Sequence, residues 1–200
     1  MRKRLVWLVF ALMVGGAGPA AAQVAWDSPL LLPPAPPAGF GIYLVEAAGG
    51  DLGVMASWRG QGSIFGFRGG IAEQEFTEDL AGFGGIDFSG RLTRASMDFP
   101  LDVDWVAGLG LGVGDDATLF SVPFGVTLGR RLDAEGAAFT PYGTPRLVVD
   151  ACLNCPGDDD VELDFGLDLG VDIALRQGWA IRFGVVLGDD REALAIGFLF

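Results

Sequence analysis

The sequence has 200 residues, of which 50% are hydrophobic, 20% are charged and 32 are glycine, and its formal net charge is −13. So acidic a chain is not expected to bind nucleic acid, because that contact depends on clusters of lysine and arginine. After the first 22 residues no long uninterrupted apolar run occurs, which excludes helical membrane spans. The glycine content and the lack of long helix-forming runs predict a single all-β domain.

Residues 1–22 have the three parts of a secretory signal peptide. Residues 2–4 are basic, residues 5–14 form an apolar core, and residues 20–22 are alanines that precede the expected cleavage point. The apolar core is too short to span a bilayer as a helix. Because Gln23 rather than a cysteine follows the cleavage point, we expect an exported chain without a lipid anchor.

Residues 23–37 are predicted to form a periplasmic lead-in to the folded domain. Five prolines lie in this stretch, and proline cannot donate to a sheet ladder. The lead-in is therefore expected to be extended, polyproline-like and mobile. A spacer is the expected role of such a tract, and a short recognition motif is the alternative.

Residues 38–200 predict ten β-strands from the alternation of apolar and non-apolar residues. The clearest case is Val161 to Arg176, where the alternation runs without a break. The predicted strands are 38–47, 52–59, 63–71, 80–91, 102–113, 117–130, 139–149, 161–176, 179–187 and 193–200. Such strands can cross hydrocarbon when tilted. The predicted fold is a transmembrane up-and-down antiparallel β-barrel of about ten strands, with eight as the alternative.

Charges separate between the two sets of connections. The odd-numbered connections hold 14 acids and one arginine, whereas the even-numbered ones hold six arginines and three acids. The odd set is 48–51, 72–79, 114–117, 150–160 and 188–192, and the even set is 59–62, 91–99, 130–137 and 176–179. An up-and-down barrel places the two sets at opposite ends, so the separation favours an even number of strands.

Aromatic residues gather near the ends of the predicted strands, as they do in the interfacial girdles of outer-membrane barrels. Those near the arginine-bearing ends are Phe40, Trp58, Phe65, Trp105, Phe139, Trp179 and Phe200, and those near the acidic ends are Phe83, Phe120 and Phe165. Packing in a protein core would scatter them along the strands instead. We therefore expect these rings to lie at membrane–water boundaries.

The final predicted strand alternates down to a terminal phenylalanine over residues 194–200. With the export signal and the strand pattern, this ending resembles the small outer-membrane β-barrel proteins of diderm bacteria, in the group of opacity-type and outer-membrane protein A-like barrels. The resemblance covers residues 38–200. It implies a place in the bacterial outer membrane, contact with outer-membrane lipid, and recognition of Phe198 and Phe200 by the barrel-assembly machinery. The commonest small members have eight strands and long outer loops, whereas this chain predicts ten strands and short loops.

Charged side chains fall on the strand face predicted to line the lumen. The predicted lumen network is Asp87, Asp102, Asp104, Asp164, Asp168, Asp172, Arg68, Arg91, Arg146 and Arg182, and Arg59, Arg176 and the rim residue Glu162 share its phase. Charges inside a barrel need partners or water. They predict either a salt-bridged plug that fixes the barrel's shape or a narrow charged path for small solutes.

Gly108, Gly110, Gly112 and Gly114 repeat at every second residue. This spacing indicates room on one strand face for bulky lumen side chains, and it does not fit a phosphate-binding turn. The acidic runs 157–160 and 188–190 lack the spacing of an EF-hand loop. Solvation is their expected state, with calcium binding as the alternative.

Cys152 and Cys155 are the only cysteines and lie in an acidic connection. A local disulfide is expected in an oxidising compartment, and free thiols are the alternative. A metal site would need two more ligands, and the chain has no histidine. We therefore predict neither a metal nor a cofactor.

The outer-membrane barrels that are enzymes generally rely on a histidine as base or proton shuttle. Since the chain has none, we expect a non-enzymatic outer-membrane barrel with a structural role or a porin-like role for small solutes. The alternative is a soluble exported barrel of lipocalin type that binds an apolar ligand. The two differ in whether the apolar face of the strands points outward or inward.

Overall fold

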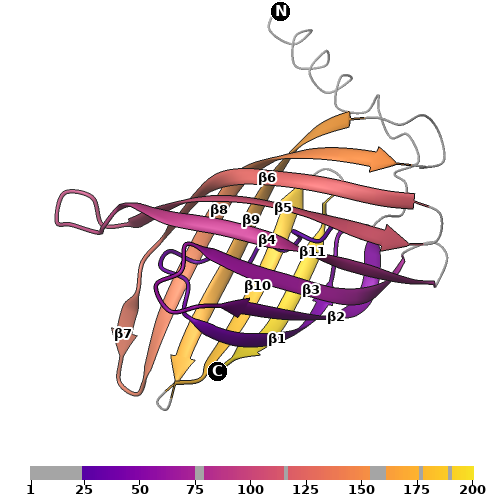
Figure 1. Cartoon of the computed structure of the whole chain (residues 1–200). Helices are drawn as coiled ribbons and strands as arrows, with labels where there is room; N and C mark the ends of the chain where they lie inside the picture. The colour runs from indigo at the N-terminus through magenta and orange to yellow at the C-terminus, as the bar shows by residue number, and fades with distance from the viewer. Residues whose placement is uncertain (1–23, 75–78, 115–116, 154–160, 176–177, 189–190) are drawn as a thin grey trace, which may run out of the picture.

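The strands form a closed antiparallel barrel (Figure 1). The computed structural model describes residues 24–74, 79–114, 117–153, 161–175, 178–188 and 191–200. The strands are β1 (Gly39–Glu46), β2 (Gly50–Arg59), β3 (Phe65–Gln74), β4 (Leu80–Thr93), β5 (Asp102–Gly114), β6 (Ala117–Gly129), β7 (Leu132–Ala134), β8 (Ala137–Leu153), β9 (Val161–Leu175), β10 (Ala180–Gly188) and β11 (Ala193–Leu199). Neighbours in the chain pair with each other, β1 pairs with β11, and β6 pairs with β8, which closes a ring of ten strands. The short β7 pairs with β8 as an extra strand.

The predicted all-β, up-and-down antiparallel barrel is confirmed, with all ten predicted strands present in the ring. The largest difference lies at β8, which has 17 residues and extends beyond the predicted range 139–149. Pro141 and Pro145 stay within this strand. The pairing of β6 with β8 is interrupted once, between the pairs Gly125–Arg146 and Leu128–Gly143, and it resumes in the same register. Proline has no backbone N–H to donate, and the sheet tolerates this loss locally.

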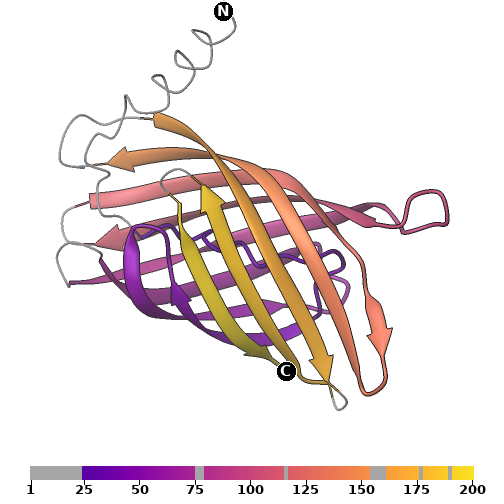
Figure 2. The same cartoon turned by 180° about the vertical axis from the view of Figure 1, so that it is seen from behind.

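The two ends of the barrel differ in charge. The turns after β1, β3, β5, β8 and β10 lie at one end, here called the acidic end, and those after β2, β4, β6 and β9 lie at the other, the arginine end, together with Gly39 and Phe200. Figures 1 and 2 show the β4–β5 connection and the β7–β8 hairpin projecting from the arginine end. No helix in the described ranges is long and apolar enough to cross a membrane.

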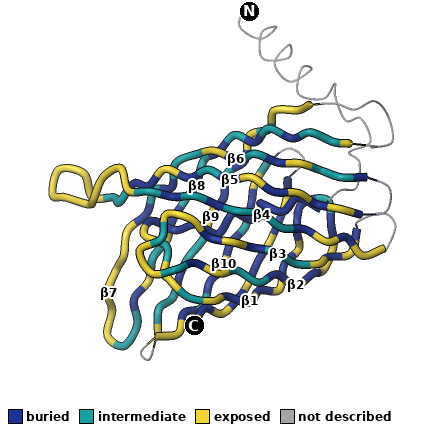
Figure 3. Tube along the Cα trace, viewed as in Figure 1, coloured by how far each residue is buried: buried dark blue, intermediate teal, exposed yellow. Residues whose placement is uncertain are grey.

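Apolar side chains point outward around the whole ring. Burial alternates residue by residue along β1 and β11, and Figure 3 shows the same alternation as changing colour along the strands. Every one of the ten barrel strands carries at least one exposed large apolar side chain. The buried face of the strands instead carries glycines, small residues and charged groups. This inside-out pattern follows directly from the two-residue period of the sequence.

The aromatic residues expected near the arginine end are all exposed on the outer surface. Phe200 contacts two of the others, since the centroid of its ring lies 5.8 Å from that of Phe40 and 5.3 Å from that of Trp179. Phe120 and Phe165 are exposed near the acidic end. The prediction for Phe83 is wrong, because this ring is only 6% exposed and points into the barrel, where Gly70 leaves space for it.

Residues 24–34, here called the lumen segment, fill the inside of the barrel. All of them are buried, and both views of the ribbon show this chain crossing the interior (Figures 1 and 2). At the acidic end Ala25 N donates to Ala48 O over 2.8 Å, and at the arginine end Ala35 N donates to Asp104 Oδ2 over 2.8 Å. The expectation of a mobile, solvated lead-in is therefore wrong for this stretch.

Glycines on the lumen face make room for the indole of Trp26. A Cβ atom added at Gly85, Gly108 or Gly110 would lie within 2.8 Å of that ring. Next along the row, a Cβ at Gly112 would collide with the carbonyl of Val24. The glycine repeat thus accommodates a bulky group as expected, but the group comes from the lumen segment and not from an opposing strand.

Candidate functional site: the charged lumen

Arg146 lies at the centre of the lumen and joins two strands to the lumen segment. Its Nε donates to Asp168 Oδ2 over 2.5 Å, its Nη1 donates to Asp27, and its Nη2 donates to Ser28 Oγ over 3.1 Å. The other Asp168 oxygen accepts from the amide of Leu30 over 3.0 Å. Because the guanidinium is completely buried, these partners compensate for the water that it has lost.

Arg191, between β10 and β11, forms a second junction toward the acidic end. It pairs with Asp27 at 3.0 Å, with Asp164 at 3.3 Å and with Asp150. Arg191 binds Oδ1 of Asp27 and Arg146 binds Oδ2, so each oxygen of this buried carboxylate has an arginine of its own.

Two further arginines bind backbone carbonyls of the lumen segment nearer the arginine end. Arg182 pairs with Asp172 at 2.5 Å and donates to Leu31 O over 2.8 Å. Arg68 donates to Pro29 O over 2.8 Å and to the carbonyl of Leu30. These carbonyls have no ladder partner inside the lumen, so the arginines supply donors that a sheet neighbour would otherwise give.

Asp87 of β4 accepts from two arginines at once. It binds Arg59, and it pairs with Arg68 at 3.3 Å. Closer to the rim, Arg91 pairs with Asp104 at 3.6 Å, and the Arg91 side chain is partly exposed.

Nine of the ten predicted lumen residues therefore form ion pairs inside the barrel. Asp102 behaves differently, because its Oδ1 accepts from Ala95 N in the exposed β4–β5 connection over 3.1 Å. Glu162 is exposed on β9. Arg176, which shares the predicted phase, lies outside the described residues.

Sequence reasoning missed three charged residues of this network, which are Asp27, Asp150 and Arg191. Asp27 belongs to a stretch with no strand pattern, and the other two were assigned to connections. A usable signal did exist for the lumen segment, since Trp26 and the leucines at 30–32 are apolar residues that a solvated spacer does not need.

The two cysteines and the acidic runs are the remaining predicted sites. Cys152, near the end of β8, is disulfide-bonded, and Cys155 lies outside the described residues. The acidic runs 157–160 and 189–190 also lie outside them. Within the described ranges no cluster of histidine, cysteine, aspartate or glutamate is arranged to hold a metal ion.

The geometry defines a closed β-barrel whose lumen is filled and cross-linked by ion pairs. Comparison with protein families, with curated proteins and with solved structures found no match.

Proposed function

We propose that the protein is a bacterial outer-membrane β-barrel with a structural, non-enzymatic role, and that its own lumen segment closes it to solutes. One observation carries the proposal: large apolar side chains are exposed on all ten strands of the ring, while a network of buried charged groups fills the inside. A soluble protein rarely exposes a contiguous apolar surface of this kind. Outer-membrane lipid is the partner that would cover it.

The aromatic rings near the arginine end support the same proposal. Their exposed positions match the interfacial girdle of membrane barrels, and the resemblance in the final strand makes Phe198 and Phe200 the expected recognition site for the barrel-assembly machinery. Both side chains are exposed on the outer face or at the end of β11.

The closed state follows from what fills the lumen. Trp26, Leu30 and Asp27 are buried in it and contact strands from several sides of the ring. Passage of small solutes would require this segment to leave the lumen, so we propose a plugged barrel in preference to an open porin.

A lipocalin-type barrel would need an apolar cavity inside and a polar surface outside. Here the outer surface is apolar, and charged groups together with the chain's own residues occupy the interior. No observation in the described part of the structure therefore favours the soluble alternative.

Cell fractionation and gel migration test the proposal. The expressed protein is expected in the outer-membrane fraction, and an unheated sample in dodecyl sulfate is expected to migrate faster than a boiled one. A protein that remains monomeric and dissolved in buffer without detergent would overturn the proposal.

A further inference from the structure

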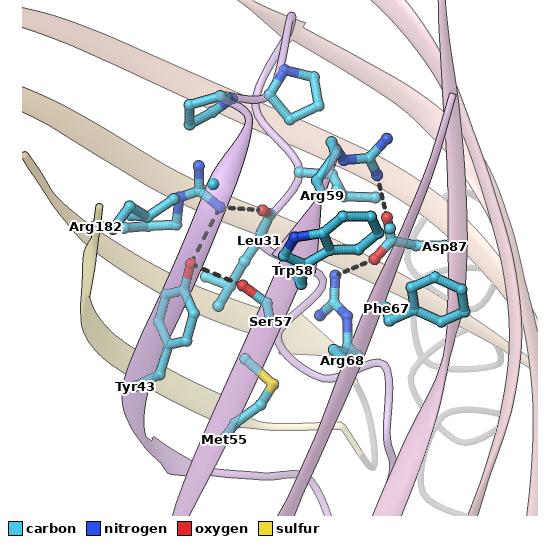
Figure 4. A pocket seen from close by; sticks show the side chains of 16 residues that line it. Leu31, Tyr43, Met55, Ser57, Trp58, Arg59, Phe67, Arg68, Asp87 and Arg182 are labelled. Carbon is cyan, nitrogen blue, oxygen red and sulfur yellow. Dashed lines mark hydrogen bonds and ion pairs between the residues drawn. The ribbon is translucent and has the colours of Figure 1, made fainter. Parts of the chain in front are cut away.

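A small cavity lies at the arginine end, where the chain leaves the lumen and begins β1 (Figure 4). Its volume is about 30 Å³, which leaves room for about two or three water-sized groups. The charged residues on its wall are Arg59, Arg68, Arg182 and Asp87, and apolar side chains of Leu31, Met55 and Leu199 complete the wall.

The positive charges of this cavity exceed the negative ones. Arg182 is neutralised by Asp172, but Arg59 and Arg68 share the single carboxylate of Asp87. The Arg59 and Arg68 side chains are only 8% and 3% exposed. Among the described residues that line the cavity, one buried positive charge is therefore left unbalanced, and such a charge favours an anion close by.

A buried donor in the same wall also lacks an acceptor. The two terminal nitrogens of Arg68 bind carbonyls of the lumen segment, but its Nε has no hydrogen-bond partner. Buried polar groups are normally paired, because an unpaired one has lost its water without compensation. The surplus charge and the unpaired donor thus both belong to arginines that line this one small cavity.

We propose that this cavity binds a small monocarboxylate of about the size of acetate between Arg59 and Arg68. A planar guanidinium matches a carboxylate in shape and hydrogen bonding. One surplus charge fits a monoanion better than phosphate, which carries more than one negative charge at neutral pH. The methyl end of such an anion suits the apolar wall at Met55 and Leu31.

Calorimetric titration of the purified protein in detergent tests the proposal at constant ionic strength. Acetate is the probe, chloride is a spherical competitor, and gluconate is a carboxylate too large for the cavity. We expect saturable binding of acetate, at least tenfold weaker competition by chloride, and no saturable binding of gluconate. Absence of saturable acetate binding, or equal binding of acetate and gluconate, would overturn the site. Competition by chloride as strong as acetate would overturn its selectivity for carboxylates.

Two variants examine the residues of the site. Arg59→Gln removes the surplus charge while Arg68 still balances Asp87, and it is expected to weaken acetate binding at least tenfold. Gly66→Ala keeps every charge but places a methyl group 3.2 Å from Arg59 Nε, and it is expected to weaken binding by blocking access. Unchanged binding in both variants would contradict the proposal.

Arg91→Gln is the matched control, because this arginine lies at the same end in a partly exposed pair outside the cavity wall. It is expected to bind acetate as the unaltered protein does. This titration needs no membrane, so its outcome is independent of where the protein resides in the cell.

Discussion

Arginines inside the barrel bind carboxylates of the strands and groups of the lumen segment together. Arg146 contacts Asp168 of β9 and Asp27 of the lumen segment, and Arg182 contacts Asp172 of β9 and the carbonyl of Leu31. An arginine is suited to this because it presents five donors in a fixed geometry. Each such side chain therefore sets both the strand arrangement and the path of the plug.

The Arg146→Met variant should be strongly destabilised. It keeps an unbranched side chain similar to the aliphatic part of arginine but leaves Asp27 and Asp168 without that guanidinium, and removing one partner of a buried pair costs about 3–5 kcal/mol. Urea unfolding in lipid vesicles, followed by tryptophan fluorescence, measures the loss in free energy of unfolding. Arg131→Met is the control, since Arg131 and Asp133 are 60% and 75% exposed and such a pair contributes at most about 1 kcal/mol. Equal losses in the two variants would contradict a stabilising role for Arg146.

The glycines that face Trp26 lead to a second prediction, for a single substitution. In Gly108→Ala the new methyl group would lie 2.8 Å from the Trp26 ring, and overpacking of this kind costs about 1–3 kcal/mol. The same substitution should cost less in a Trp26→Ala background, which a double-mutant cycle in urea measures. Gly82→Ala is the control, because a Cβ there meets nothing within 4 Å. Additive effects of the Gly108 and Trp26 substitutions would show that the two positions do not interact.

Among the elements, the strands could be predicted and the lumen segment could not. A two-residue period identifies a strand and its two faces, and this was sufficient even for β8 with its two prolines. Residues 24–34 have no period, and the partners that hold them lie more than 100 residues away at Arg146 and Arg191. β7 was missed for a related reason, since three exposed residues carry no pattern.

Deletion of residues 24–34 should convert the barrel from closed to conducting. Arg146 would keep Asp168 and Arg182 would keep Asp172, so the ring retains its strand-to-strand ion pairs and is expected to fold. Single-channel recording in a planar bilayer should show stable current steps for the deletion. The intact protein should show none.

A deletion of residues 95–99 in the exposed β4–β5 connection is the control for the conductance experiment. This connection lies outside the lumen, so the control should stay closed. The assignment of this segment as the plug would be contradicted by steady current through the intact protein. It would also be contradicted if the variant that lacks the lumen segment folds but shows no current.

At the scale of the whole molecule, the barrel is inverted relative to a soluble protein. Apolar side chains surround the ring on the outside, and charged groups from seven of the ten strands meet within. The alternating sequence predicted the two faces, and the separation of charged connections predicted an even ring. Whether lipid covers the apolar outer face depends on the surroundings of the protein.

Leu109→Arg should destabilise the protein in lipid vesicles. Leu109 is 45% exposed near the middle of β5, and an arginine at the midplane of a bilayer costs about 2–4 kcal/mol in a membrane barrel. Leu132→Arg on β7 is the control, because this residue is similarly exposed at 49% but lies outside the ring. Urea unfolding from vesicles measures both. A neutral effect of Leu109→Arg would mean that water, not lipid, faces this surface.

The path of the lumen segment fixes how the two termini of the folded domain are oriented. Val24 lies beside Gly50 and Gly112 at the acidic mouth, whereas Phe200 pairs with Phe40 at the opposite mouth. If lipid surrounds the ring as proposed, an epitope joined just ahead of Val24 and one joined after Phe200 would face different compartments, and antibodies applied to intact cells would reach only one of them. The ring also has to close around a chain already in place, or else a free amino terminus must be drawn through it.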